Sequence, residues 1–198
     1  MTRLPANFLL GAVLVAIVIG LAALSLVWTP HDATALDIRN KFADPSMSNW
    51  LGTDQLGRDV VSQLMLGARN SMTVALVAVL MGGSIGVALG LLAAGIGGWV
   101  EDLVMRLADL SFAFPALLFA IMLAAVFGPS LSNAVFAIAF INIPIFARVT
   151  RASANQIWTR DYVMAARAAG MGTFAISRDH ILPNIAAAVI VQATIEFA

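Results

Sequence analysis

Long apolar runs are the feature of this sequence that most restricts what the chain can fold into. Hydrophobic residues make up 61% of the 198 residues, whereas charged residues make up only 11%. A soluble domain of this length cannot bury that much apolar surface, so the chain is predicted to lie in a lipid bilayer. Because helices satisfy their own backbone hydrogen bonds in lipid, we expect an all-α, polytopic transmembrane helical bundle.

The apolar runs give the expected spans. The first is residues 8–28, and its length favours a retained span over a secretory signal, which has a shorter apolar core. Residues 71–96, 103–127 and 132–147 supply three more. A fifth begins at Asn184 and has only 15 residues, fewer than the roughly 20 that a bilayer core requires. We therefore expect the chain to be truncated at its C terminus.

A row of small residues predicts a helix-packing face. Gly82, Gly86 and Gly90 recur at intervals of four within the second predicted span. Such a row lets two helix backbones approach closely, which is a main source of attraction between helices in lipid. We expect these glycines to lie against another helix, in this chain or in a second subunit.

Proline and polar positions interrupt the later spans. Pro115 is expected to bend the third span, and Arg106 is expected to pair with Asp109 one helical turn away. Asn142 and Pro144 are expected to interrupt the fourth span. The Asn142 amide is a candidate residue of a wet pathway, and satisfaction of a kinked backbone is the alternative interpretation.

Several kinds of chemistry are excluded. The absence of cysteine removes disulfides and thiolate metal sites, and no H-E-x-x-H zinc motif occurs. The only lysine, Lys41, follows Asn40, so the Gly-Lys pair of a phosphate-binding Walker A loop is missing. Both histidines, His31 and His180, lie outside the apolar runs. We predict no catalytic, metal or cofactor site in this chain, and its formal net charge of zero gives no reason to expect nucleic acid as a partner.

A charged island interrupts the apolar pattern at residues 158–183, W-T-R-D-Y-V-M-A-A-R-A-A-G-M-G-T-F-A-I-S-R-D-H-I-L-P. Its first half is predicted to be one helix, with Trp158, Tyr162 and Ala165 on one face and Arg167 on another, wettable face. The alanines around Arg167 leave this helix with little side-chain bulk. It could therefore approach another protein surface closely.

The second half of the island is predicted to contain a hinge. Gly170 and Gly172 are expected to end the first helix, and Thr173 is expected to cap a second, short one. Pro183 suits the first turn of a new apolar helix, where its missing N–H is not needed.

Another polar motif precedes the second span. Residues 51–59 read L-G-T-D-Q-L-G-R-D. Thr53, Asp54 and Asp59 are good N-cap residues, and a short interfacial helix is expected between them and the span. We interpret these polar side chains as caps and turns, not as substrate ligands.

The island resembles a known family. Ala165-Ala166, Gly170 and Leu182-Pro183 stand at the spacing of the cytoplasmic loop of bacterial ABC importer permeases, E-A-A, three residues, G, nine residues, I-x-L-P. The A-A-R-A-A-G, H-I-L-P-N and G-T-D-x-x-G-R-D segments resemble the dipeptide, oligopeptide and nickel branch of that family. One position departs from the pattern, because Met164 stands where the family has glutamate.

The resemblance implies the rest of an assembly. It implies a permease subunit of an ATP-driven importer for di- or oligopeptides, with nickel or another small solute as alternatives. Its partners would be a second permease, two cytoplasmic ATPase subunits that bind ATP and Mg, a periplasmic or lipid-anchored solute-binding protein, and membrane lipid. The residues implied for coupling to the ATPase are Tyr162, Ala165, Ala166, Arg167, Ala169, Gly170, Leu182 and Pro183.

Basic residues predict the orientation of the chain. With a cytoplasmic N terminus, seven of the Lys and Arg residues lie inside and four outside, which favours this topology in a bacterial inner membrane. Residues 1–50 would form the first helix and a periplasmic segment, and residues 51–198 the permease core with a coupling loop at 148–183. The competing interpretations are a self-contained secondary transporter or channel and a non-transporting scaffold. Sparse charge in the spans argues against the first, and the pair of motifs argues against the second.

Overall fold

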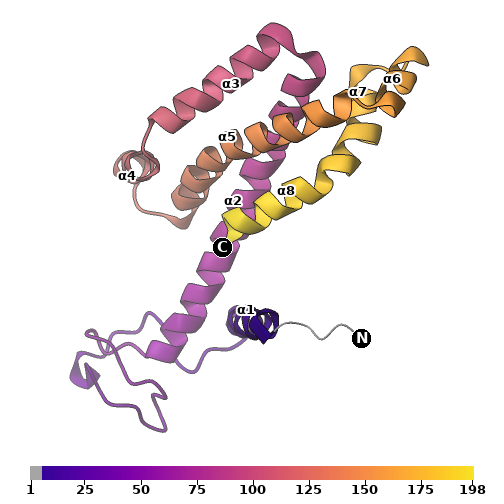
Figure 1. Ribbon diagram of the computed structural model, residues 1–198. Coiled ribbons are helices and arrows are strands. Elements are labelled where there is room, and N and C mark those ends of the chain that lie inside the picture. The colour runs from indigo at the N-terminus through magenta and orange to yellow at the C-terminus, as the bar shows by residue number, and fades with distance from the viewer. Residues whose placement is uncertain (1–5) are drawn as a thin grey trace. The chain divides into compact units, whose positions relative to one another are not determined.

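The computed structural model describes residues 6–198, and apart from one isolated β-bridge its regular secondary structure is helical (Figure 1). The prediction of an all-α fold is confirmed. The elements are α1 Ala6–Leu24, η1 Ile38–Asn40, α2 Val60–Ile96, α3 Gly98–Ala113, α4 Ala116–Phe127, α5 Leu131–Trp158, α6 Asp161–Ala168, α7 Thr173–Ile176, η2 Ser177–Ile181 and α8 Leu182–Phe197.

The described chain forms two compact units, the first ending at Thr73 and the second beginning at Val74. The first unit contains α1, the polar segment that follows it and the first turns of α2. The second contains the rest of α2 and all later helices, with α5 contacting α3, α4 and α8 (Figure 1).

Three helical segments are long and apolar enough to cross a bilayer: Val60–Ile96, Leu131–Trp158 and Thr173–Phe197. The third of these extends the predicted fifth span, because its helix begins eleven residues before Asn184. The first predicted span is shorter than expected, since α1 ends at Leu24 and the chain turns there. The Trp28 N–H still donates to the Leu24 carbonyl, at 2.9 Å.

The second predicted span is part of a longer helix. No break separates an interfacial helix from the span, because α2 is continuous over 37 residues. At 1.5 Å per residue this helix is about 55 Å long, well beyond the roughly 30 Å of a hydrocarbon core. Its polar first turns therefore extend out of the apolar region.

The two internal prolines behave differently. The predicted third span is broken before Pro115, where Phe114 is extended and α3 and α4 are bent by 78°. A residue that precedes proline avoids the helical conformation, which explains the position of the break. The predicted interruption at Pro144 is wrong, because α5 continues through it. Pro144 is buried, and neighbouring helices commonly stabilise such a helix in a membrane protein.

The glycine row of α2 faces α5. A Cβ atom added at Gly86 would lie 2.5 Å from the Ile143 carbonyl oxygen and 2.6 Å from the Phe146 Cβ. At Gly90 it would lie 2.6 Å from the Ala147 carbonyl oxygen. A Cβ at Gly82 would likewise collide with the α5 backbone. The two backbones are thus in direct contact along this row.

Asn142 lies on the same interface. Its side chain is 2% exposed and its Cβ faces Gly82, and its Nδ2 has no hydrogen-bond partner among the described residues. The α2–α5 contact, not an open channel within this chain, surrounds the amide in this conformation. A role for Asn142 in the pathway stays a prediction.

Ion pairs link α3 to α5. The expected pair within α3 is wrong, because Asp109 bonds to Arg148 of α5 and not to Arg106. A second pair joins Glu101 to Arg151. These contacts hold the end of α5 from which the charged island emerges.

Candidate functional site

The charged island contains a folded helical loop between α5 and α8, and its first residue and last two residues belong to those helices. The predicted helix starting at Trp158 is wrong in its first turn, because Trp158 belongs to α5 and the chain breaks at Thr159 and Arg160. Arg160 is extended and precedes α6, which begins at Asp161. An acidic residue in the first turn and Arg167 in the last turn both complement the helix dipole.

Gly170 ends α6 as the sequence predicts. Its φ of +86° lies in the left-handed region, which favours glycine. The Gly170 N–H donates to the Arg167 carbonyl at 3.0 Å, and the Met171 N–H donates to the Ala166 carbonyl at 3.1 Å. These two bonds form a Schellman motif, which satisfies carbonyls at the helix end and turns the chain sharply.

The next helical segment starts without a side-chain cap. Gly172 precedes α7 and no side-chain hydrogen bond caps it, so the predicted capping role of Thr173 is wrong. The chain then remains helical through η2, whose backbone is widened, into α8. The Leu182 N–H donates to the Ser177 carbonyl, five residues back. This wider turn accommodates Pro183, which lies in the first turn of α8 as predicted.

A buried apolar cluster holds the loop in place. Val163 of α6 is 1% exposed and belongs to one cluster with Ala154 of α5, Ile176 of α7 and Ile185 of α8. Ala166 and Met171 pack against this cluster. Because one core joins the loop to two long helices, α6 is fixed to the ends of both.

The outer face of α6 is not covered by any part of residues 6–198. Tyr162 and Met164 are 44% and 55% exposed, and Ala165 and Ala169 are also exposed. Phe174, at the start of the next helical segment, is 80% exposed. This outer surface is apolar, and its alanines add little side-chain bulk. It comprises Tyr162, Met164, Ala165, Ala169 and Phe174.

Six of the predicted coupling residues lie in the loop, and the structure separates them into two groups. Tyr162, Ala165, Arg167, Ala169 and Gly170 are exposed. In contrast, Ala166 is half-buried against the internal cluster.

The last two predicted coupling residues lie beyond the loop. Leu182 lines an apolar cavity of about 480 Å³ next to Phe174, and Pro183 is exposed in α8. Met164 and Phe174 were not among the predicted coupling residues. Both could have been identified in the sequence as large apolar residues within a charged segment.

Arg167 contacts the last residue of α5, and no acidic residue among residues 6–198 forms an ion pair with it. Its guanidinium lies 5.2 Å from the centre of the Trp158 ring, a cation–π distance. Arg167 is itself exposed, so its charge remains accessible from outside the chain.

The second sequence motif builds the polar segment before α2. Asp54 Oδ1 accepts the backbone N–H groups of Leu56 and Arg58, and its Oδ2 accepts the Arg58 guanidinium and the Gln63 amide, all within 3.0 Å. Burial raises the pKa of Asp54, but these hydrogen bonds outweigh it and hold that pKa well below its usual value. Asp54 thus organises the turn that precedes α2.

Asp59 caps α2. Its Oδ2 accepts the Ser62 N–H at 2.9 Å and the Ser62 hydroxyl at 2.7 Å, and its Oδ1 accepts the Asn49 amide at 3.0 Å. His31 Nδ1 lies 3.8 Å from Oδ2. Burial raises the pKa of Asp59, but these hydrogen bonds and the nearby His31 lower that pKa by a larger amount, so the net shift is downward. The interpretation of these side chains as caps and turns accounts for every contact described.

Within residues 6–198, no three His, Cys, Asp or Glu side chains group as metal ligands would. The candidate site consists of a short exposed helix, a sharp turn at Gly170 and a core that fixes both to the long helices.

These features define a multi-pass helical membrane protein with a folded loop between two of its long helices. Residues 86–198 match the family described as "Binding-protein-dependent transport system inner membrane component". The match covers the glycine face from Gly86, the ion pairs and the whole loop. The chain belongs to this family.

Curated relatives lie in the branch that the sequence motifs predict. The dipeptide transport system permease protein DppC of Alkalihalophilus pseudofirmus is 38% identical over 96% of this chain and 62% of its own length. The probable D,D-dipeptide transport system permease protein DdpC of Escherichia coli is 36% identical over 91% of this chain and 62% of its own length. The nickel transport system permease protein NikC of Escherichia coli is 32% identical over 94% of this chain and 68% of its own length. The chain spans about six tenths of the length of the first two.

Proposed function

We propose that this chain acts as a permease subunit of an ATP-driven ABC importer in a bacterial inner membrane. Membership of the binding-protein-dependent family supports this proposal, as do the dipeptide and nickel permeases among its relatives. Di- or oligopeptides are the proposed solutes, with nickel or another small solute as the alternative. The pathway would form between this chain and a second permease.

The observation that carries the proposal is that α6 packs on the long helices with one face and leaves the other face exposed. Its inner residue Val163 is buried in a cluster shared with α5 and α8, while Tyr162, Met164 and Ala165 remain uncovered. A body pressed against this outer surface would move α5 and α8 together, because the shared core transmits the displacement. Such an arrangement suits coupling to a separate motor.

That motor would be a pair of cytoplasmic ATPase subunits. They would bind ATP and Mg, because Lys41 follows Asn40 and no Walker A lysine is available here. A periplasmic or lipid-anchored binding protein would deliver the solute on the opposite side. This chain would then supply no catalytic step, and its N terminus would lie in the cytoplasm.

Copurification tests the proposal. The tagged chain is expressed with its transporter genes, extracted in a mild detergent and analysed for bound subunits. We expect an ATPase subunit and a second permease to be retained. Repeated purification of a transport-active protein without any ATPase would instead favour a self-contained transporter.

A further inference from the structure

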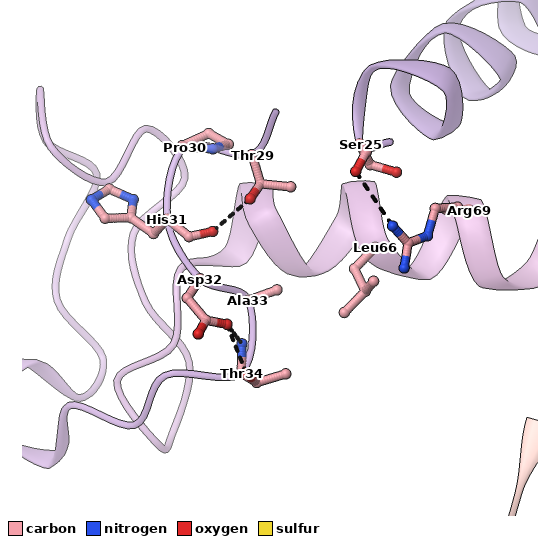
Figure 2. A pocket seen from close by; sticks show the side chains of 9 residues that line it. All are labelled: Ser25, Thr29, Pro30, His31, Asp32, Ala33, Thr34, Leu66 and Arg69. Atoms are coloured by element: carbon pink, nitrogen blue, oxygen red, sulfur yellow. Dashed lines mark hydrogen bonds between the residues drawn. The ribbon is translucent and has the colours of Figure 1, made fainter. Parts of the chain in front are cut away.

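Two adjoining cavities lie in the first unit, and one arginine lines both. The first cavity, of about 590 Å³, is lined by polar groups of residues 25–34 together with Leu66 and Arg69 of α2 (Figure 2). The second, of about 240 Å³, is lined by Ile19, Ala22 and Leu26 of the α1 region and by Arg69 and Met72. A partly polar hollow and a mostly apolar groove thus share Arg69.

Arg69 is short of hydrogen-bond acceptors. Its guanidinium has a single long hydrogen bond, from Nη1 to the Ser25 carbonyl at 3.5 Å, and no carboxylate within ion-pair distance among residues 6–198. The acidic side chain of the same cavity, Asp32, is directed to Thr34 and accepts its N–H at 2.8 Å and its hydroxyl at 2.7 Å (Figure 2). Arg69 is also half-buried, so a large part of its charge is neither paired nor fully hydrated.

The position of Arg69 along α2 places it at a bilayer boundary. The apolar stretch of α2 begins at Ser71, two residues later, and α1 ends at Leu24 beside it. Arginine at the end of a membrane helix normally reaches to the level of the lipid headgroups. By this rule the first cavity would lie at headgroup depth, and the groove lined by Ala22 and Met72 would face the acyl chains.

We propose that these cavities form a binding site for an anionic phospholipid. The phosphate of the lipid would accept hydrogen bonds from Arg69, with the Thr29 and Ser25 region around the headgroup. One acyl chain would lie in the groove between Ala22 and Met72. The charge of the arginine selects a negative headgroup, and the apolar continuation selects a ligand with a tail over a free anion.

Native mass spectrometry of the assembled transporter in neutral detergent tests this site. The complex is titrated with phosphatidylglycerol or with phosphatidylcholine of the same acyl chains. Wild type should retain phosphatidylglycerol preferentially, and Arg69→Gln should reduce that retention roughly fivefold, as expected for one interfacial charge. Arg69→Lys should keep most of the retention. Arg39→Gln is the matched control. Arg39 is exposed on η1, so this substitution removes the same charge at a position away from the cavities.

A second variant tests the groove without changing charge. Ala23→Trp would fill the groove and should reduce retention of both lipids, while circular dichroism checks that helix content is unchanged. Equal retention of phosphatidylglycerol by wild type and Arg69→Gln would overturn the proposal. Full competition by millimolar inorganic phosphate would also overturn it, because the ligand would then be a soluble anion. A cross-link from Ala23→Cys to another subunit would overturn it as well, because a protein helix would then occupy the groove.

Discussion

The carbonyl oxygen of Ile143 lies so close to Gly86 that an added Cβ would be 2.5 Å away from it. Replacing Gly86 by Leu should therefore separate α2 from α5. Overpacking of a well-packed contact costs about 1 to 3 kcal/mol, and collision with a backbone leaves little room for relief. We expect Gly86→Leu to lower the thermal unfolding temperature in detergent and to reduce assembly.

Gly67→Leu is the matched control for this prediction. Gly67 lies on the same helix, and no atom lies within 4 Å of its added Cβ. If Gly86→Leu unfolds and assembles as Gly67→Leu does, the close backbone contact does not stabilise the protein.

Asp59 should stabilise the polar segment in a pH-dependent way. Because its pKa is lowered on folding, its contribution is present above the unfolded value of about 3.9 and is lost as the pH falls through the folded value. Asp59→Ala should cost about 1 to 2 kcal/mol near pH 7, since it removes a helix cap and leaves the Ser62 N–H without its acceptor.

Thermal unfolding at pH 7 and at pH 3 to 4 measures this effect. The difference between wild type and Asp59→Ala should shrink at the lower pH. Asp44→Ala serves as control, because Asp44 is exposed and accepts no hydrogen bond in the described structure. A difference that grows on acidification would contradict the assigned direction.

Gly170 should tolerate no β-branched residue. Its φ of +86° is unfavourable for valine by about 1 to 3 kcal/mol, so Gly170→Val should distort the exit from α6. Limited proteolysis should detect a more mobile loop. Gly172→Val is the control, because Gly172 has φ −72° and ψ 156° and open space around its Cβ position. Equal protease resistance in both variants would show that the left-handed turn is not needed.

How far sequence alone predicted the structure depends on the kind of feature. Hydropathy located the apolar helices, and the left-handed turn at Gly170 followed from local chemistry. Partners distant in sequence did not follow: Asp109 pairs with Arg148, 39 residues away. The two prolines could not be told apart either, because only packing shows that Pro144 is buried and Pro115 is exposed.

At the candidate site, too, the sequence predicted the local features but not the packing contacts. Composition identified α6 as a slim helix, but its rotation about its own axis depends on the apolar cluster beneath it. Ala165 and Ala166 look equivalent in the sequence, yet the second packs on Val163's cluster and the first is exposed. A large side chain at Ala166 would therefore disturb this chain's own core, whereas one at Ala165 would disturb an external partner.

Two single cysteines can test the proposed orientation, because the chain has none of its own. Met47 is 97% exposed in the polar segment, and Thr159 is exposed at the break before α6. An impermeant thiol reagent should label Met47→Cys in intact cells and should label Thr159→Cys only after permeabilisation. The reverse pattern would invert the topology and place α6 on the wrong side for an ATPase.

The proposed function requires the outer surface of α6 to dock an ATPase subunit. Ala165→Trp adds bulk to this surface without entering the internal cluster, and overfilling a docked contact should cost about 1 to 3 kcal/mol. Arg167→Gln should have a smaller effect, because an exposed charge contributes roughly 0 to 1 kcal/mol. Ala35→Trp adds the same bulk in the exposed polar segment and should leave docking unchanged.

The most direct measurement is the amount of ATPase that copurifies with each variant in the complete transporter, together with solute uptake in cells. We expect Ala165→Trp to lose most of the bound ATPase and of the uptake, Arg167→Gln to retain most of both, and Ala35→Trp to retain the bound ATPase. Wild-type levels of bound ATPase and of uptake in a stably folded Ala165→Trp protein would contradict docking of the ATPase on this surface.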